Sequence, residues 1–287
     1  MSLYEFVAAR LIGTRLQRPA EWLRQVRGAR FRREHPELIE WFLEGGRTDA
    51  YVRRVVAPDT NAIDIGCHIG SFLQTLVTLA PHGHHHAFEP VAHKAAWLRR
   101  KFPNVTVHAV ALSDATGSAE FHVNKHQSSY SGLKPRGPEG RFERVEVACR
   151  MLDDEMAGQP RIGFVKIDVN GAESSVLRGA RAFLRRDRPY LLLECTRSGL
   201  DDYGVPSDEV HALLTQECGY RIHLLKEWLE GGPALDAAGF AASMIYPFQA
   251  FNYAVVPTES ARNGSARPAV GEPASKQQSE RRAKGTT

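Results

Sequence analysis

The stretch "NAIDIGCHIGSFLQTLVTLA" (residues 61–80) contains a complete strand, loop and helix. Its first five residues form a short, mostly apolar run, which predicts a buried strand, and apolar residues then recur every three or four positions, which predicts a helix. The loop between them has the spacing D-x-G-x-x-x-G. This spacing differs from the G-x-G-x-x-G of dinucleotide-binding loops and lacks the G-K-[S/T] of P-loops. The unit is therefore a strand, a glycine loop and a helix, with an acid, Asp64, before the glycines.

The same alternation of strands and helices continues to residue 256. Predicted strands lie at residues 61–65, 84–88, 105–109, 162–167, 189–194, 220–225 and 251–256. Helical patterns lie between them at residues 70–80, 91–102, 172–186 and 207–219. This rhythm predicts an α/β fold with a mostly parallel, seven-stranded sheet and helices on both faces. Residues 231–250 are rich in Gly and Ala, and we expect a connection without a clear helix there.

The chain divides into a main domain, residues 51–257, and two extensions. Residues 1–50 are interpreted as an N-terminal helical extension or cap, whose second helix (36–46) ends at Gly45-Gly46. Residues 258–287 contain one valine and no other large apolar residue, so we expect a disordered tail.

One insertion interrupts the main domain. Residues 119–150 contain two short strand patterns joined by a polar segment rich in Gly and Pro. We interpret this insertion as a β-hairpin and its central part, residues 124–141, as a mobile flap near the site.

The net charge of +4 is concentrated at the two ends. Residues 1–35 hold eight Arg and three Glu, and residues 258–287 hold six Lys or Arg and three Glu. The segment between them holds 23 basic and 27 acidic residues, which is the wrong sign for nucleic-acid binding. The Arg-rich N-terminus is interpreted as a helical cap on the main domain, and the alternatives are a peripheral contact with an anionic membrane and a transit peptide. The oligomeric state stays open.

The sequence shows no secretory or membrane-spanning signal, so we expect the protein in the cytoplasm. The chain has no apolar run near the roughly 20 residues that span a bilayer, and its N-terminus does not resemble a signal peptide. The four cysteines are widely scattered and form no C-x-x-C pair, which fits a reducing compartment.

Acidic residues follow the first five predicted strands, at or near their carboxyl ends. They are Asp64, Glu89, Asp114, Asp168 and Glu194. Ligands of open α/β sheets bind beyond the carboxyl ends of the strands. Carboxylates there would repel a pyrophosphate but attract the ammonium and sulfonium groups of S-adenosylmethionine. The ribose hydroxyls of that cofactor can donate hydrogen bonds to Glu89.

Six segments between Asn61 and Glu194 carry a resemblance to a known family. They are "IDIGCHIGSF", "AFEPVAHKAAWLRRKF", "VALSDATGSAEFHV", "VACRMLDDEM", "FVKIDVNGAESSVLRGA" and "PYLLLE". In order and spacing they resemble the FkbM-type S-adenosylmethionine-dependent methyltransferases. The resemblance implies a Rossmann-like class I methyltransferase fold. It also implies O-methylation of a hydroxyl of a sugar, a glycolipid or a secondary metabolite.

The strand-end pattern and the resemblance together give a predicted cofactor site. Its members are Asp64, Gly66, Cys67, His68, Gly70, Glu89, Pro90, Ser113, Asp114 and Asp168. By resemblance, the two glycines line the cofactor, Glu89 binds the ribose, and the Ser113–Asp114 turn lies near the adenine. Two positions depart from the family pattern, because His68 stands where Asn is usual and Asn170 stands where Glu is usual.

Asp168 is the first candidate for the catalytic base or for the group that orients the acceptor, and Glu194 is the second. His68 adds a titratable group to the same site. Asp168 and Glu194 could alternatively hold Mg²⁺ or Ca²⁺, but they fall short of a full ligand set, and we predict no metal site. Glu173 is interpreted as a residue of a helix start. The "HGHHH" run (82–86) cannot easily converge on one ion, because consecutive strand residues point to opposite faces.

Two other functions remain open at this stage. The departures at His68 and Asn170 allow a cofactor-binding or interaction protein of the same fold that does not catalyse. An NAD(P)-dependent oxidoreductase is disfavoured by the missing G-x-G-x-x-G motif. For the enzyme, the expected partner is a small-molecule or glycan acceptor.

Overall fold

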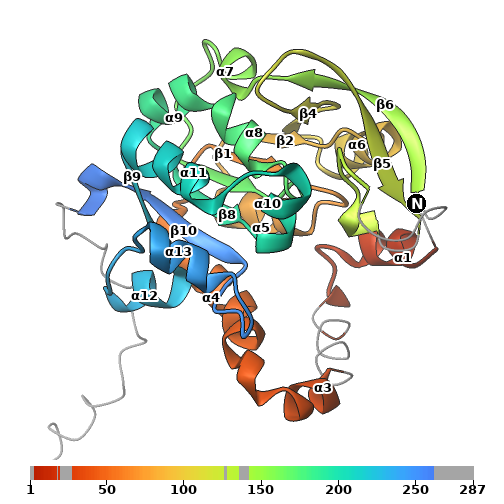
Figure 1. The fold of residues 1–287 in the computed structure, drawn as a ribbon. Coiled ribbons are helices and arrows are strands. Elements are labelled where there is room, and N and C mark those ends of the chain that lie inside the picture. The colour runs from red at the N-terminus through yellow and green to blue at the C-terminus, as the bar shows by residue number, and fades with distance from the viewer. Residues whose placement is uncertain (1–2, 18, 20–27, 126–127, 136–141, 262–287) are drawn as a thin grey trace, which may run out of the picture.

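The computed structural model describes residues 3–17, 19, 28–125, 128–135 and 142–261 (Figure 1). Its centre is a seven-stranded sheet in the order β3-β2-β1-β7-β8-β10-β9. The strands are β1 (Ala62–Ile65), β2 (His85–Phe88), β3 (Val105–His108), β7 (Phe164–Ile167), β8 (Tyr190–Glu194), β9 (Tyr220–Leu224) and β10 (Asn252–Pro257). β10 is antiparallel to β8 and β9, and the other neighbours pair in parallel. The predicted fold class and the seven strand positions are confirmed.

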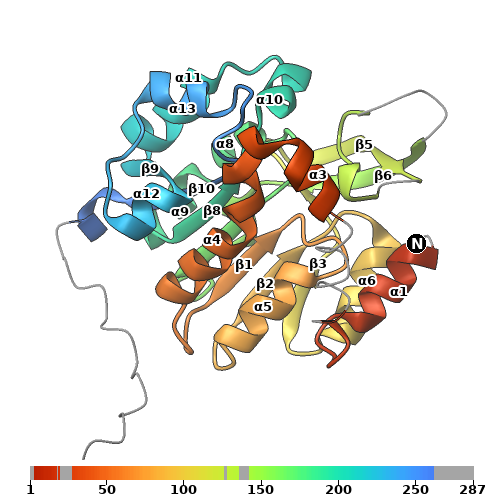
Figure 2. The same ribbon diagram turned by 90° about the horizontal axis from the view of Figure 1, so that it is seen from below.

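Helices cover both faces of this sheet (Figures 1 and 2). One face carries α4 (Ile39–Val55), α5 (Ser71–Leu79), α6 (Ala92–Lys101) and α12 (Leu225–Glu230). The other face carries α8 (Glu173–Arg178), α9 (Arg181–Asp187), α10 (Arg197–Tyr203), α11 (Ser207–Ala212) and α13 (Ala237–Ser243). Every residue of β1, β2 and β7 is buried, because helices or neighbouring segments cover both faces of these strands.

A second, three-stranded sheet contains the inserted hairpin. Its order is β4-β6-β5, with bounds β4 (Ala111–Leu112), β5 (Gly117–Asn124) and β6 (Phe142–Arg150). β5 and β6 pair antiparallel along their whole length, which confirms the predicted hairpin. Residues 126–127 and 136–141 of the predicted flap lie outside the described residues, so its mobility stays a prediction. The described part contains a short 3₁₀ turn, η2 (Ser128–Tyr130).

Several helices differ from the prediction. α4 continues through Gly45-Gly46 to Val55 and crosses the predicted domain boundary at residue 50. Two glycines in a helix cost about 1 kcal/mol each, and the burial of Tyr51 and Val52 against the sheet offsets that cost. α13 forms within the segment expected to lack a helix, and its first turn is capped by Asp236, whose side chain accepts from Gly239 N.

The remaining helical segments are short. They are α1 (Leu3–Leu11), α3 (Ala29–Glu34), η1 (Pro36–Leu38), α7 (Leu152–Glu155), a π-helical turn (Leu213–Glu217) and η4 (Thr258–Ala261). The helix predicted over 172–186 is divided into α8 and α9, and the pattern at 207–219 ends in the π-helical turn. The predicted disordered tail has its first four residues in η4, and residues 262–287 lie outside the described part.

Helix α1 packs on α5 and α6 (Figure 2). Ala9 and Ile12 are buried there, and Lys101 Nζ donates to the carbonyl of Ile12 at 2.6 Å. The first helix is therefore docked on the main domain. Within the described part of the chain, none of the helices is both long and apolar enough to cross a membrane.

Candidate active site

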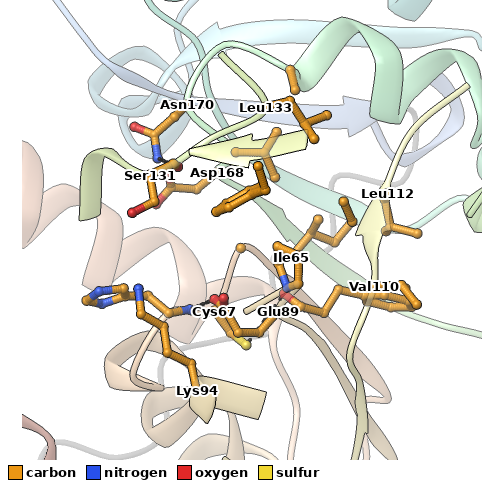
Figure 3. Close-up of a pocket in the computed structure, with 18 of the residues that line it drawn as sticks. Ile65, Cys67, Glu89, Lys94, Val110, Leu112, Ser131, Leu133, Asp168 and Asn170 are labelled. Carbon is orange, nitrogen blue, oxygen red and sulfur yellow. Dashed lines mark hydrogen bonds between the residues drawn. The ribbon is translucent and has the colours of Figure 1, made fainter. Parts of the chain in front are cut away.

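A cavity of about 270 Å³ lies beyond the carboxyl ends of β1, β2 and β7 (Figure 3). Residues of the hairpin insertion, Phe121, Ser128, Ser131 and Leu133, form part of its wall. The volume is close to the lower end of the roughly 300–1,000 Å³ typical of small-molecule sites. The cavity is thus at the edge of the sheet where the sequence concentrates its acids.

The glycine loop between β1 and α5 forms the floor of this cavity. Gly66 has φ +77°, and a β-carbon built on it would lie 1.9 Å from the carbonyl oxygen of Asp168. The amides of Gly66 and Cys67 donate to the carbonyl of Phe88 and so tie the loop to β2. His68 also has a positive φ, +52°. Gly70, with φ +86°, caps α5 and packs beside Leu98 and Phe102 of the α6 region, outside the cavity wall.

Glu89, directly after β2, is held in place by two backbone amides. Its Oε2 accepts from His68 N and its Oε1 accepts from Val91 N, each at 3.0 Å. Burial raises the pKa of Glu89 to about 7, although Lys94 and the two amides act in the opposite direction. Each carboxylate oxygen keeps acceptor capacity, so Glu89 can also accept from a ligand hydroxyl.

A row of alternating charges crosses the sheet below the cavity. Asp64 of β1 is paired in register with Lys166 of β7, and the two side chains lie on the same face. Lys166 Nζ is 3.6 Å from Asp64 Oδ1 and 2.9 Å from Asp168 Oδ2. Burial alone would lower the pKa of Lys166, but the Asp168 and Asp64 carboxylates raise it above its usual value. Burial also raises the pKa of Asp64, which is fully enclosed and lies outside the cavity wall.

Glu194 lies beside Asp168, because β8 is the parallel neighbour of β7. Burial raises the pKa of Glu194 to about 8, and repulsion from Asp168 adds to the shift. The raised pKa favours the protonated form of Glu194 at pH 7, and its carboxyl group is hydrogen-bonded to Asp168. Of the two predicted catalytic acids, Asp168 borders the cavity, whereas Glu194 lies behind it.

Glu173 is the first residue of α8, as predicted for a residue of a helix start. Its side chain also fixes the loop after β7. Glu173 Oε1 accepts from Val169 N at 3.1 Å and from Gly171 N at 3.0 Å. Burial raises the pKa of Glu173 to about 7. Asn170, between these amides, has φ +56° and faces the hairpin segment.

The apolar end of the cavity is made by Phe88, Val110 and Leu112. Ser113 and Asp114, which follow Leu112 directly, are not among the residues that line the cavity. The amide of Ser113 donates to the carbonyl of Arg150, and Asp114 Oδ2 lies 3.6 Å from Arg178 Nη1. That this turn lies near the adenine stays a prediction.

The structure therefore divides the predicted site residues into two groups. Those that line one cavity are Gly66, Cys67, His68, Glu89, Pro90 and Asp168. Those that lie outside its wall are Asp64, Gly70, Ser113, Asp114 and Glu194. Within the second group, Asp64 and Glu194 act on the site residues through charge, and Gly70 acts through backbone geometry.

Three charged residues at or near the cavity are absent from the predicted site, namely Lys166, Lys94 and Glu5. Glu5 of α1 lies within 3.1 Å of His68 Nε2 and 3.8 Å of Lys94 Nζ. Lys94 is almost completely buried, and burial lowers its pKa. Burial, followed by the charge of Lys94, lowers the pKa of His68 to about 4, so the imidazole is neutral at pH 7. The sequence does not indicate that Glu5, a single acid in an amphipathic helix, contacts His68 and Lys94.

A metal ion has no evident site in the described residues, where no group of three or more His, Cys, Asp or Glu side chains is arranged to hold one. In the "HGHHH" run, His85 contacts the carbonyl of Ala80 and His86 contacts His108. These two side chains belong to consecutive positions of β2 and lie on opposite faces.

A seven-stranded, Rossmann-like sheet with its cavity at the carboxyl edge defines the chain as a class I methyltransferase-like α/β protein. Comparison with known families makes the assignment specific. The sequence pattern of the methyltransferase FkbM domain matches residues 64–222, which is more than half of the chain. The chain belongs to the FkbM family of methyltransferases.

Two characterised relatives match part of the chain. One is the 2-O-methyltransferase NoeI of Sinorhizobium fredii, 30% identical over 155 residues, covering 46% of this chain and 61% of NoeI. The other is the AMB antimetabolite synthetase AmbE of Pseudomonas aeruginosa, 30% identical over 165 residues, covering 44% of this chain and 8% of AmbE. The chain thus spans less than two thirds of either relative.

Among solved structures, an FkbM methyltransferase from Methylobacillus flagellatus superposes with a TM-score of 0.43 at 17% identity. The match covers 70% of this chain and 44% of that one. A fibrillarin from Aeropyrum pernix with bound S-adenosylmethionine superposes with a TM-score of 0.38 at 12% identity, covering 70% and 68%.

Proposed function

We propose that this protein is an S-adenosylmethionine-dependent methyltransferase that methylates a hydroxyl group. The observation that carries the proposal is the convergence of Gly66, Glu89 and Asp168, from three strand ends, on one cavity. The family assignment supports the reaction type.

The cavity residues fit the cofactor in shape and charge. Gly66 admits no side chain, so the backbone is open to a close approach by the methionine portion. Glu89 can accept from the ribose hydroxyls, and the apolar end around Val110 and Leu112 suits a purine ring. Both lysines at the cavity face carboxylates, Lys166 with Asp168 and Lys94 with Glu5, so no excess positive charge is left for a phosphate.

When bound, the cofactor supplies an activated methyl group on a sulfonium. The protein's part is to hold the acceptor hydroxyl in line with that methyl group and to accept its proton. Asp168 is placed for both tasks, because its carboxylate borders the cavity and Lys166 fixes its orientation from below. Glu194, protonated at neutral pH, adds a hydrogen-bond donor on the far side of Asp168.

The acceptor that fits best is a hydroxyl of a sugar, a glycolipid or a secondary metabolite. Neutral polar groups, Ser128, Ser131 and Asn170, form the wall opposite Glu89, and such groups suit a polyhydroxylated molecule (Figure 3). The similarity to a 2-O-methyltransferase supports this class of acceptor. We place the protein in the cytoplasm, in keeping with its four free, buried cysteines.

Calorimetric titration with S-adenosylhomocysteine, with NADH as the comparison, tests the cofactor. We expect saturable binding of the first ligand only, and binding of NADH alone would favour an oxidoreductase. Incubation with methyl-labelled cofactor and fractionated cell extract then tests the reaction. Labelled product is expected in a fraction of hydroxylated metabolites or glycolipids. Cofactor binding with no labelled product in any fraction would instead support a non-catalytic member of the family.

A further inference from the structure

Helix α1 and the loop after β7 are distant in sequence, but both contact the same short segment of the hairpin insertion. We call this segment, Ser128–Leu133, the cover segment, because Ser128, Ser131 and Leu133 line the cavity from the hairpin side. A backbone pair ties it to β5, since His122 N donates to Gly132 O at 2.8 Å and Gly132 N donates to His122 O at 3.2 Å. This pair holds the segment at Gly132, and other contacts hold it at Ser128 and Ser131.

The first end is held by α1. The hydroxyl of Ser128 donates to Glu5 Oε1, and the imidazole Nε2 of His68 lies 2.6 Å from Ser128 Oγ and 3.1 Å from Glu5 Oε1. With the ring proton on Nε2, these groups form a chain in which His68 donates to Ser128 and Ser128 donates to Glu5. The Glu5 carboxylate is itself fixed, because α1 is docked through Ala9 and Ile12.

An interior residue of the segment, Ser131, is held by the loop after β7. Asn170 Nδ2 donates to the carbonyl of Ser131 at 3.2 Å (Figure 3). Ser131 also connects the segment to itself and to β5. Its hydroxyl donates to Ser128 O at 2.7 Å and accepts from Asn124 N at 3.0 Å. Ser128 and Ser131 are therefore linked to each other as well as to α1 and the loop after β7.

The two contacts involve the same two positions, His68 and Asn170, at which the chain departs from its family pattern. An ionised Glu at position 170 could not donate to the Ser131 carbonyl, whereas the Asn amide does. We propose that Glu5 and Asn170 are positioning residues that hold the cover segment over the cavity, Glu5 through Ser128 and His68, and Asn170 through Ser131. This inference rests on the proposed function only for the identity of the ligand beneath the segment.

Three variants test it. Glu5→Ala removes the acceptor of the Ser128 hydroxyl, and Glu5→Gln keeps an oxygen acceptor at the same position. Asn170→Asp keeps the side-chain shape and the tolerance of positive φ but removes the amide donor. The matched controls are Glu34→Ala on α3 and Asn104→Asp after α6, which make equivalent changes at exposed positions.

The first readout is hydrogen exchange of the unliganded protein, resolved at the amides of Asn124, Ser131 and Gly132. We expect roughly three- to tenfold faster exchange in Glu5→Ala and Asn170→Asp, the range expected for the loss of one hydrogen bond. Glu5→Gln and both controls should stay within about twofold of the wild type. Equal exchange in the wild type, Glu5→Ala and Asn170→Asp would overturn the proposal. An effect of Glu5→Gln as large as that of Glu5→Ala would overturn the role assigned to the Ser128 contact.

The second readout is the release rate of S-adenosylhomocysteine, measured by rapid mixing. Glu5→Ala and Asn170→Asp should release it roughly three- to tenfold faster, with melting temperatures near that of the wild type. Unchanged release from both variants would overturn the covering role. If the wild-type protein does not bind S-adenosylhomocysteine, the proposed function fails, and the exchange measurement still decides whether the cover segment is held as described.

Discussion

The carbonyl oxygen of Asp168 lies where a side chain on residue 66 would have to begin, 1.9 Å from a β-carbon built on Gly66. Residue 66 starts the glycine loop after β1, and Asp168 follows β7, the neighbouring strand. The glycine thus has two functions, because it adopts φ +77° and it lets two strand ends approach each other beneath the cavity. A side chain at residue 66 would therefore clash with the backbone of Asp168 in its present position.

We predict that Gly66→Ala destabilises the protein by at least about 3 kcal/mol, because positive φ and a backbone clash add together. Gly158→Ala is the matched control, since Gly158 has φ +72° but nothing within 4 Å of a built β-carbon. It should cost only about 1–2 kcal/mol, the price of the left-handed conformation for alanine. Urea unfolding of both variants provides the measurement. Equal losses would show that the loop relaxes around the new side chain.

We expect Glu89 to make binding of the proposed cofactor depend on pH. Its pKa of about 7 means that the carboxyl is largely protonated at pH 6 and ionised at pH 8. Because ribose hydroxyls donate to the ionised form, binding must release that proton below pH 7. We expect S-adenosylhomocysteine to bind on the order of tenfold more weakly at pH 6 than at pH 8.

Glu89→Gln should weaken this binding at every pH and remove the slope, as calorimetry at pH 6, 7 and 8 would reveal. His68 is not expected to contribute to the slope, because its pKa of about 4 lies below this range. A slope that persists in Glu89→Gln would assign the pH dependence to another group.

The sheet and the cavity floor were predictable from the sequence because their signals are local. A buried strand followed by a glycine loop and a helix is specified within twenty residues, as in residues 61–80, and each strand end then carries its own acid. The continuation of α4 through Gly45-Gly46 was not predictable in the same way. It depends on the burial of Tyr51 and Val52 against strands more than a hundred residues away.

The side walls of the cavity were less predictable, because they depend on contacts between segments that are distant in sequence. Glu5 reaches His68 across 63 positions of the sequence, and nothing in its surroundings distinguishes it from the other acids of the N-terminal helices. The Ser113–Asp114 turn was placed at the adenine end by resemblance. A motif does not encode the contacts of that turn with the Arg150 carbonyl and with Arg178, and its place relative to the adenine stays a prediction.

Asp168→Asn should separate chemistry from binding. The amide keeps the size of the side chain but cannot accept a proton, so we expect turnover to fall by about 10²-fold or more. The affinity for S-adenosylhomocysteine should stay within about threefold, because Glu89 and the glycine loop are unchanged. Asp59→Asn, at an exposed position before β1, is the control for the loss of one negative charge. Turnover equal to that of the wild type would exclude Asp168 from the chemistry.

Glu194 links the site to the stability of the whole domain. Its pKa is about 8 in the folded protein and 4.5 in an unperturbed chain, so the folded state holds a proton that the unfolded state releases between these values. The contribution of Glu194 to stability is therefore fully present below about pH 4.5 and is lost as the pH rises towards 8. In Glu194→Gln the melting temperature should fall less steeply between pH 5 and pH 8 than in the wild type. The control is Glu230→Gln, a change at an exposed position of α12, which should leave the slope of the wild type unchanged. Identical slopes in all three proteins would mean that the pKa of Glu194 is not raised in the folded protein.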